Sequence, residues 1–214
     1  VTVHDPEPAS GASHHAGGML APTAEVVYKQ DPLFPLMRAS AEWYPDLITL
    51  TAKYTDLPTG YRTDGTLVVA RDTADKTHLE ELTEYQSRHG MAVEKLTVRQ
   101  ARKLEPALSP AINGAVSIDG DHRVQPRLFT RALLDACRSA NVTFTSDRID
   151  SLDQLDSADQ VVVANGLGAQ HLVEGLDLRP VYGDVLHARA PQHQHPLLTH
   201  VVRGFVEDRP VYLI

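Results

Sequence analysis

The sequence predicts a mixed α/β fold, α+β overall, in which a Rossmann-like domain is interleaved with a mostly antiparallel β-sheet domain. Two glycine-rich turns, at residues 10–18 and 165–168, each follow a β-branched run, as in α/β sheets that bind nucleotides. Helical and strand patterns alternate between these turns, whereas strand patterns alone follow Arg179. A chain of 214 residues has room for one large domain or two small interleaved ones.

The first twenty residues carry the first of these turns. Val1-Thr2-Val3 is typical of a buried strand, and the acidic residue Asp5 and a run of small residues follow it. A carboxylate at the end of a parallel strand can bind the ribose hydroxyls of a dinucleotide, and a glycine-rich turn lets backbone N–H groups approach a phosphate. On spacing alone, a strand followed by an irregular loop explains these residues equally well.

The middle of the chain is predicted to alternate helices and strands. Asp31-Pro32 begins a helix as N-cap and first helical residue, and Pro45 should kink that helix. Thr97 and Gln100 form a capping box. The elements expected after the first helix are strands at 66–70, 91–96 and 112–118, and helices at 73–89, at 98–104 and from Pro126 onward.

The last third is predicted to be mostly strand. Residues 160–164 (QVVVA) have the pattern of the most buried strand in the chain, and Asn165-Gly166-Leu167-Gly168 is the second glycine turn. The other strands expected here lie at 142–145, 149–152, 181–190, 200–206 and 211–214.

Composition restricts the partners. The net charge of −8 argues against nucleic acid or an anionic membrane surface, and no apolar run approaches the roughly 20 residues of a membrane helix. The single cysteine, Cys137, excludes an internal disulfide and fits a reducing compartment. We therefore expect a cytoplasmic protein with no nucleic-acid or membrane partner.

Several polar groups suggest other chemistry. The pair His14-His15 lacks a third metal ligand nearby, and the tract of His193, His195 and His200 has no cysteine or carboxylate nearby in the sequence. Ser13 lacks the strand–turn–helix context of a hydrolase nucleophile. His122-Arg123, after Asp119 and Asp121, is either an acid–base cluster or a polar hairpin tip. We expect no metal site and no side chain that must act as a general base.

Four motifs in order together resemble the FAD-dependent D-amino-acid oxidase family, most closely its glycine oxidases of thiamine biosynthesis. The first, GASHHAGGMLAPTAE, is similar to the family segment that lies against the flavin. The second contains D-x-x-V-x-P at residues 121–126, where the family's chain returns to the flavin domain. The third and fourth are VVVANGLGAQHL and LRPVYGDVLHARAP, so the resemblance runs along the whole chain.

The resemblance implies FAD as cofactor and assigns site residues. Asp5 would bind the adenosine ribose, and Tyr212 would direct its hydroxyl at the substrate carboxylate. The other implied FAD contacts are Ala12, Ser13, Ala164 and Gly166 at the pyrophosphate, Gly17, Gly18 and Met19 beside the isoalloxazine, and the backbone of Ile149 at adenine. Without the resemblance, Asn165-Gly166 is an ordinary tight turn and Tyr212 an ordinary core aromatic.

The resemblance also implies domains and an activity. Residues 1–58 plus 121–177 would form the FAD-binding domain, and 59–120 plus 178–214 the substrate-binding domain. The implied reaction is oxidative deamination of glycine, or of other small D-amino acids or amines, to an imino acid and hydrogen peroxide, with dioxygen as second substrate. It could feed thiazole synthesis for thiamine. The alternatives are a sarcosine oxidase, a D-amino-acid dehydrogenase, or a non-catalytic remnant that serves as a binding module.

Two family features are missing from the sequence. No G-x-G-x-x-G turn precedes Val1, and the chain ends just after Tyr212, where the family continues with further strands. We therefore expect an internal fragment of a longer enzyme, and a homo-oligomer for the complete enzyme. Expressed alone, this stretch is expected to bind no FAD stoichiometrically and to aggregate or stay partly unfolded.

Overall fold

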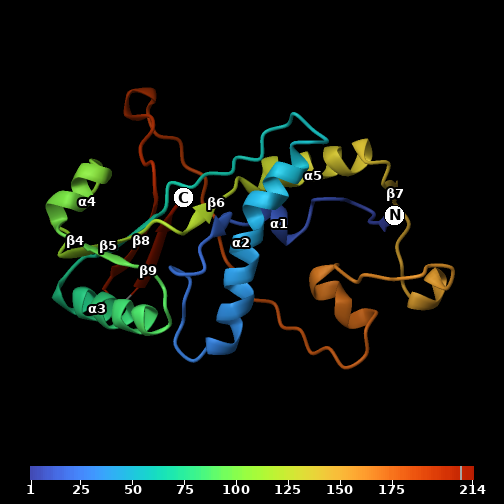
Figure 1. Cartoon of the computed structure of the whole chain (residues 1–214), viewed down its shortest axis with the longest axis horizontal. Coiled ribbons are helices and arrows are strands. Elements are labelled where there is room, and N and C mark those ends of the chain that lie inside the picture. The colour runs from blue at the N-terminus through green and yellow to red at the C-terminus, as the bar shows by residue number, and fades with distance from the viewer. Residues whose placement is uncertain (208) are drawn as a thin grey trace.

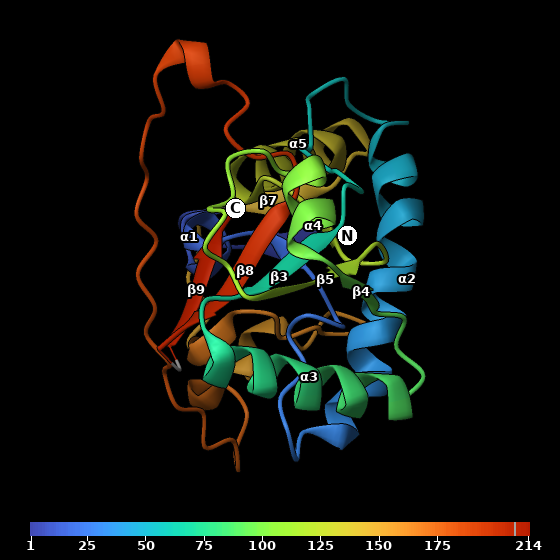
Figure 2. The same cartoon turned by 90° about the vertical axis from the view of Figure 1, so that its left-hand side faces the viewer.

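The computed structural model describes residues 1–207 and 209–214, and its largest unit is a five-stranded mixed sheet (Figures 1 and 2). Within this sheet only the β3–β8 pairing of the described strands is parallel, while β4–β5, β5–β3 and β8–β9 are antiparallel. The expected β-sheet domain is therefore present, although its central pairing makes it mixed. In spatial order its strands are β4 (Glu94–Leu96), β5 (Gly114–Ile118), β3 (Thr66–Ala70), β8 (Val201–Val206) and β9 (Arg209–Leu213).

The sheet is covered on both faces by helices. Figure 2 shows α3 (Thr73–Arg88) and α4 (Val98–Leu104) on opposite sides of it. Side chains of β3 alternate between the faces, because successive residues of a strand point in opposite directions. Leu67 packs with Ala101 on the α4 side, and Val68 packs with Leu79 on the α3 side.

The ends of these helices follow the sequence prediction. Thr97 and Gln100 form the predicted capping box at the start of α4, and Asp72 and Asp75 form a second one at the start of α3. Gly90, with a φ of +72°, follows the end of α3 in the left-handed region that favours glycine. Helix α5 (Pro126–Ser139) begins at Pro126, as expected.

The remaining elements form a smaller unit beside the main sheet. β1 (Thr2–His4) pairs in parallel with β7 (Thr143–Thr145), and β2 (Met19–Leu20) pairs antiparallel with β6 (His122–Arg123). Helix α1 (Ala12–His15) packs against α5. A 3₁₀ turn over Asp31–Leu33 leads into α2 (Phe34–Thr51), which continues through Pro45 as one helix.

Three predicted strands are wrong. Residues 149–152, 160–164 and 181–190 carry no strand, and this part of the chain contains only 3₁₀ turns, at Leu152–Leu155, Gly166–His171 and Gln192–Gln194. Val162 is 79% exposed, and residues 181–190 form an extended excursion at the left of Figure 2. A buried strand needs neighbours that pair with its backbone, and none of the described strands pairs with these runs. β1 forms where predicted but is largely exposed, because among the described strands it pairs with β7 alone.

Candidate functional site

Asp5 lies at the carboxyl end of a parallel strand pair. Its backbone N–H donates to the carbonyl oxygen of Thr145 at 3.0 Å, which continues the β1–β7 ladder by one residue. Its Oδ1 accepts the N–H of Glu7 at 2.9 Å, and the side chain is half-buried. Ile149 follows Thr145 by four residues, so the two predicted adenosine contacts follow neighbouring strand ends. This is where α/β sheets bind nucleotides.

The predicted pyrophosphate and flavin residues follow Asp5 into a turn packed against α5. Ala12 and Ser13 are exposed in α1, and the Nε of Arg127 in α5 donates to the carbonyl oxygen of His14 at 3.4 Å. The carbonyl oxygen of Gly18 accepts the N–H of Val124 at 2.9 Å. The segment from α1 to Gly18 is thus hydrogen-bonded to the start of α5 and to the residues just before it.

Gly18 is required by the fold itself. Its φ is +88°, and a Cβ there would meet the carbonyl oxygen of Val124 and the ring of Pro126. A Cβ on Gly17 would lie 2.5 Å from Ile214. The prediction that Gly18 leaves room for a flavin remains a prediction, because the backbone conformation already accounts for this glycine.

Met19 leads from this turn into β2 and then into a loop held by a buried carboxylate. Asp121 is fully buried, and its two carboxylate oxygens accept the N–H groups of Thr23 at 3.2 Å and Ala24 at 3.0 Å. Burial raises the pKa of Asp121 to about 6, while these hydrogen bonds and the charge of Arg203 oppose the rise. The sequence pattern predicts an acid–base cluster or a polar hairpin tip at Asp121, and neither describes this buried anchor. The signal that marks it is its place as the first residue of the D-x-x-V-x-P motif.

The second predicted pyrophosphate segment lies in the exposed part of the chain after β7. Ala164 and Gly166 are exposed, and Gly166, with a φ of +59°, begins the 3₁₀ turn as part of a glycine turn, as predicted. No neighbour lies within 4 Å of a Cβ built on Gly166. In Figure 1 residues 150–175 (orange) lie on the same side of the molecule as β7 and the N-terminus. The described contacts bring neither residue to Ala12, Ser13 or Gly17.

Tyr212 lies in β9 opposite Arg203 of β8. The guanidinium carbon of Arg203 is 4.5 Å from the centre of the Tyr212 ring, and Arg203 forms an ion pair with Glu25. Both side chains border a cavity of about 20 Å³, which has room for about one water molecule. An amino-acid substrate would therefore have to contact Tyr212 from its exposed side.

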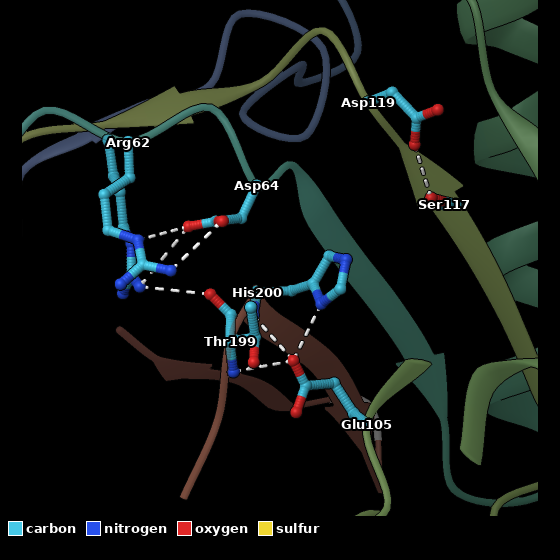
Figure 3. Close-up of polar contacts among 8 residues, drawn as sticks. Arg62, Asp64, Glu105, Ser117, Asp119, Thr199 and His200 are labelled. Atoms are coloured by element: carbon cyan, nitrogen blue, oxygen red, sulfur yellow. Dashed lines mark hydrogen bonds and ion pairs between the residues drawn. The ribbon is translucent and has the colours of Figure 1, made fainter. Parts of the chain in front are cut away.

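A second polar cluster holds the segment just before β8 to Glu105, which follows α4 (Figure 3), and to Arg123 in β6. Glu105 is 2% exposed, and its Oε1 accepts the N–H of Thr199 at 2.7 Å and both the N–H and the Nδ1 of His200 at 2.6 and 2.7 Å. Arg123 donates to the carbonyl oxygen of Thr199 at 3.1 Å and lies 3.8 Å from Asp64. These bonds fix the chain at the point where it enters β8.

Two titratable side chains meet beside β6. The hydroxyl of Tyr61 and the Nδ1 of His122 are 2.7 Å apart. Burial lowers the pKa of His122 and raises that of Tyr61, so both groups are held toward their neutral forms. This hydrogen bond links the segment around Tyr61 to β6. Across residues 1–207 and 209–214 no group of three or more His, Cys, Asp or Glu side chains could hold a metal ion.

The fit of a dinucleotide can be judged from the strand pair. One observation shows that the residues present fit a dinucleotide. β1 and β7 are parallel, and the half-buried carboxylate of Asp5 directly follows the carboxyl end of β1. Asp5 and the backbone around Ile149 would hold the adenosine part of such a ligand. Among the described residues no helix is long and apolar enough to cross a membrane.

Comparison with known proteins identifies relatives along the whole chain. The family model described as FAD dependent oxidoreductase matches residues 1–214. A Rhizobium etli protein named as a thiamine biosynthesis oxidoreductase, ThiO, is 28% identical over 207 residues, which are 96% of this chain and 56% of that protein. The uncharacterized oxidoreductase YurR of Bacillus subtilis is 27% identical over 83% of this chain and 51% of its own length.

Solved structures give the same result. Glycine oxidase from Geobacillus kaustophilus superposes with a TM-score of 0.77 at 25% identity, over 95% of this chain and 59% of the other. Iminodiacetate oxidase from Chelativorans sp. BNC1 superposes with a TM-score of 0.58 at 25% identity, over 69% and 40%. The chain spans about half the length of the curated relatives it matches.

Proposed function

We propose a function from one established premise: this chain belongs to the family of FAD-dependent oxidoreductases, whose model matches its whole length. FAD is therefore its cofactor. The proposed reaction is the oxidation of glycine or another small amino acid or amine, with dioxygen as second substrate, to an imino acid and hydrogen peroxide. The observation that carries this proposal is the likeness to glycine oxidase over 95% of the chain.

The proposed division of labour follows the two units of the fold. Residues 1–58 plus 121–177 would bind FAD, and residues 59–120 plus 178–214 would bind the substrate. Figure 1 supports this division, because β1 and β7 lie at one end of the molecule and the five-stranded sheet lies at the other. The β2–β6 pair belongs to the proposed FAD-binding unit and lies between these two ends.

The proposed roles of individual residues rest on the match to the family, and for Asp5 its place at the end of a parallel strand pair is a further support. Asp5 would accept the ribose hydroxyls, while Ala12, Ser13, Ala164 and Gly166 would lie at the pyrophosphate. Gly17, Gly18 and Met19 would pass the flavin ring, with Ile149 at adenine. Tyr212 would donate its hydroxyl to the substrate carboxylate from the exposed face of β9. FAD supplies the hydride acceptor and the route to dioxygen, and the protein orients the substrate and excludes water.

The finer parts of the proposal rest on the relatives. A role in thiamine biosynthesis is supported by the likeness to the R. etli ThiO protein. An N-substituted glycine is a second candidate substrate, since the chain also superposes on iminodiacetate oxidase. A cytoplasmic location and a homo-oligomeric assembly belong to the same proposal.

The test uses the protein expressed from its complete reading frame. We expect bound FAD and peroxide release with at least one of glycine, sarcosine, D-alanine and iminodiacetate. Asp5→Ala should weaken FAD binding about ten- to a hundredfold, because charge-assisted hydrogen bonds contribute roughly 1.5–3 kcal/mol. Asp159→Ala, which removes an exposed carboxylate, is the matched control. An unchanged FAD dissociation constant in Asp5→Ala would refute the ribose assignment, and a flavin-free protein would refute the proposed function.

A further inference from the structure

We propose that Arg203 is a positioning residue that holds the ring of Tyr212 in place for the substrate. This inference rests on the proposed function, because it takes Tyr212 as the residue that binds the substrate carboxylate. Its basis is geometric. A chain of contacts starts in the loop at residues 21–26, which follows the proposed flavin segment. It runs from Glu25 in this loop through Arg203 to Tyr212.

The first link is the cross-strand pair. Arg203 and Tyr212 are directly opposite in the antiparallel β8–β9 register, and the guanidinium stacks 4.5 Å from the ring centre. Directly opposed side chains on one face of a sheet are the closest neighbours across two strands, and an arginine over an aromatic face is an attractive contact. Tyr212 is 43% exposed, and the stack on Arg203 is the contact that fixes the orientation of its ring.

The second link holds the arginine itself. Its side chain is 12% exposed, and it forms an ion pair with Glu25. Glu25 directly follows Ala24, whose N–H is bound by the buried carboxylate of Asp121. The guanidinium is therefore held from a loop that is itself anchored, and its plane cannot turn freely. The loop begins one residue after β2, so this chain of contacts joins the proposed flavin side to the proposed substrate side.

The charges around Arg203 indicate how it acts. Glu25 pairs with its guanidinium, and the Asp121 carboxylate lies close enough to interact with it electrostatically. Its positive charge is thus compensated from within the protein, and attraction of an anionic substrate is a minor part of its role. What Arg203 supplies to Tyr212 is a flat, fixed surface. A lysine would keep the charge and lose that surface.

The first experiment separates these roles by steady-state kinetics of the full-length holoenzyme. Arg203→Lys should raise KM about tenfold, while kcat changes less than twofold and the FAD content stays full. Glu25→Gln should raise KM about threefold. Both effects are expected because the Tyr212 ring is oriented less well for the substrate. In Arg203→Lys/Tyr212→Phe, KM should be close to that of Tyr212→Phe alone, since both changes remove one interaction. Arg88→Lys, in an exposed ion pair with Glu84 on α3, is the control for an arginine substitution. An unchanged KM in Arg203→Lys, or multiplicative effects in the double variant, would overturn the proposal.

The second experiment does not depend on activity. With 3-fluorotyrosine at position 212, the ¹⁹F resonance of the unsubstituted protein should be displaced from that of the free amino acid, and Arg203→Lys should move it toward the free value. If the resonance is the same in both proteins, Arg203 does not hold the ring. If the resonance moves but the holoenzyme oxidises none of the four amines, the positioning stands and the proposed function fails.

Discussion

Two valine-rich runs of nearly the same composition adopt different structures in this molecule. Thr66–Ala70 (TLVVA) is the central strand of the main sheet, and Leu67 in it is 0% exposed. Residues 160–164 (QVVVA) form no strand, and Val162 is 79% exposed. The difference lies in their neighbours: β3 pairs with β5 on one side and β8 on the other, while the second run pairs with no described strand. A β-branched run makes a strand possible, and partners make it stable.

The same contrast divides the chain as a whole. The main sheet is packed from both faces, and its helices end in capping boxes and a left-handed glycine. Residues 146–198 have no buried side chain and contain short 3₁₀ turns only. Stability should therefore be unevenly distributed, with the sheet opening only on global unfolding and residues 146–198 opening locally.

The largest predicted effect tests this contrast directly. Leu67→Ala should lower the free energy of unfolding by about 2–5 kcal/mol, because it leaves a cavity between β3 and α4. Val162→Ala should change it by less than about 0.5 kcal/mol, since its side chain is already in water. Urea denaturation followed by circular dichroism measures both in the full-length protein. Equal losses in the two variants would show that residues 160–164 are buried in solution and that the contrast is wrong.

The elements that the sequence predicted well are those whose signals are local. The capping box at Thr97 and the proline at the start of α5 each act within a few residues, and each is confirmed. The strand predicted at residues 160–164 is wrong because a strand is stable only when another strand pairs with it. The residue pattern of one strand contains no information about such a partner. The family likewise followed from four motifs in order, and the model that matches the whole chain confirms it.

The candidate site was less predictable than the fold. Asp5 lies at a parallel strand end, as the sequence argument expected, but its contact with FAD stays a prediction. Asp121 and Arg203 escaped the sequence argument, because their partners Thr23 and Glu25 are 98 and 178 residues away along the chain. The sequence marks Asp121 only as the first residue of the D-x-x-V-x-P motif, and the fold shows which loop returns to it.

A second prediction concerns the anchored loop and has a pH signature. Burial raises the pKa of Asp121 to about 6 in the folded protein, above its value of 3.8 when unfolded. The folded state therefore binds the proton more tightly, so this group adds stability at low pH that is lost as the pH rises through about 6. Relative to Asp121→Asn, the wild type should gain up to about 3 kcal/mol between pH 7 and pH 4.

The measurement is urea denaturation of both proteins at half-unit pH steps. The difference between their unfolding free energies is plotted, so that all other titrating groups cancel. Asp159→Asn, an exposed change within residues 146–198, is the control for the substitution itself. A difference curve that is flat from pH 7 to pH 4 would show that the Asp121 carboxyl is solvated, and that the loop at 21–26 is held by other contacts.

The smallest predicted effect compares two capping boxes of the same kind, one in each region. Thr97 caps α4, whose Ala101 is fully buried on the sheet, whereas Ser151 caps a single 3₁₀ turn with no buried residue. Thr97→Ala should cost about 1 kcal/mol of global stability, because α4 unfolds together with the sheet. Ser151→Ala should cost less than about 0.3 kcal/mol, because local opening of that turn is not coupled to global unfolding. Amide hydrogen exchange separates the two cases, since protection should fall across β5 in Thr97→Ala and only within residues 151–155 in Ser151→Ala. Loss of protection in the main sheet on removal of Ser151 would mean that the two regions unfold as one.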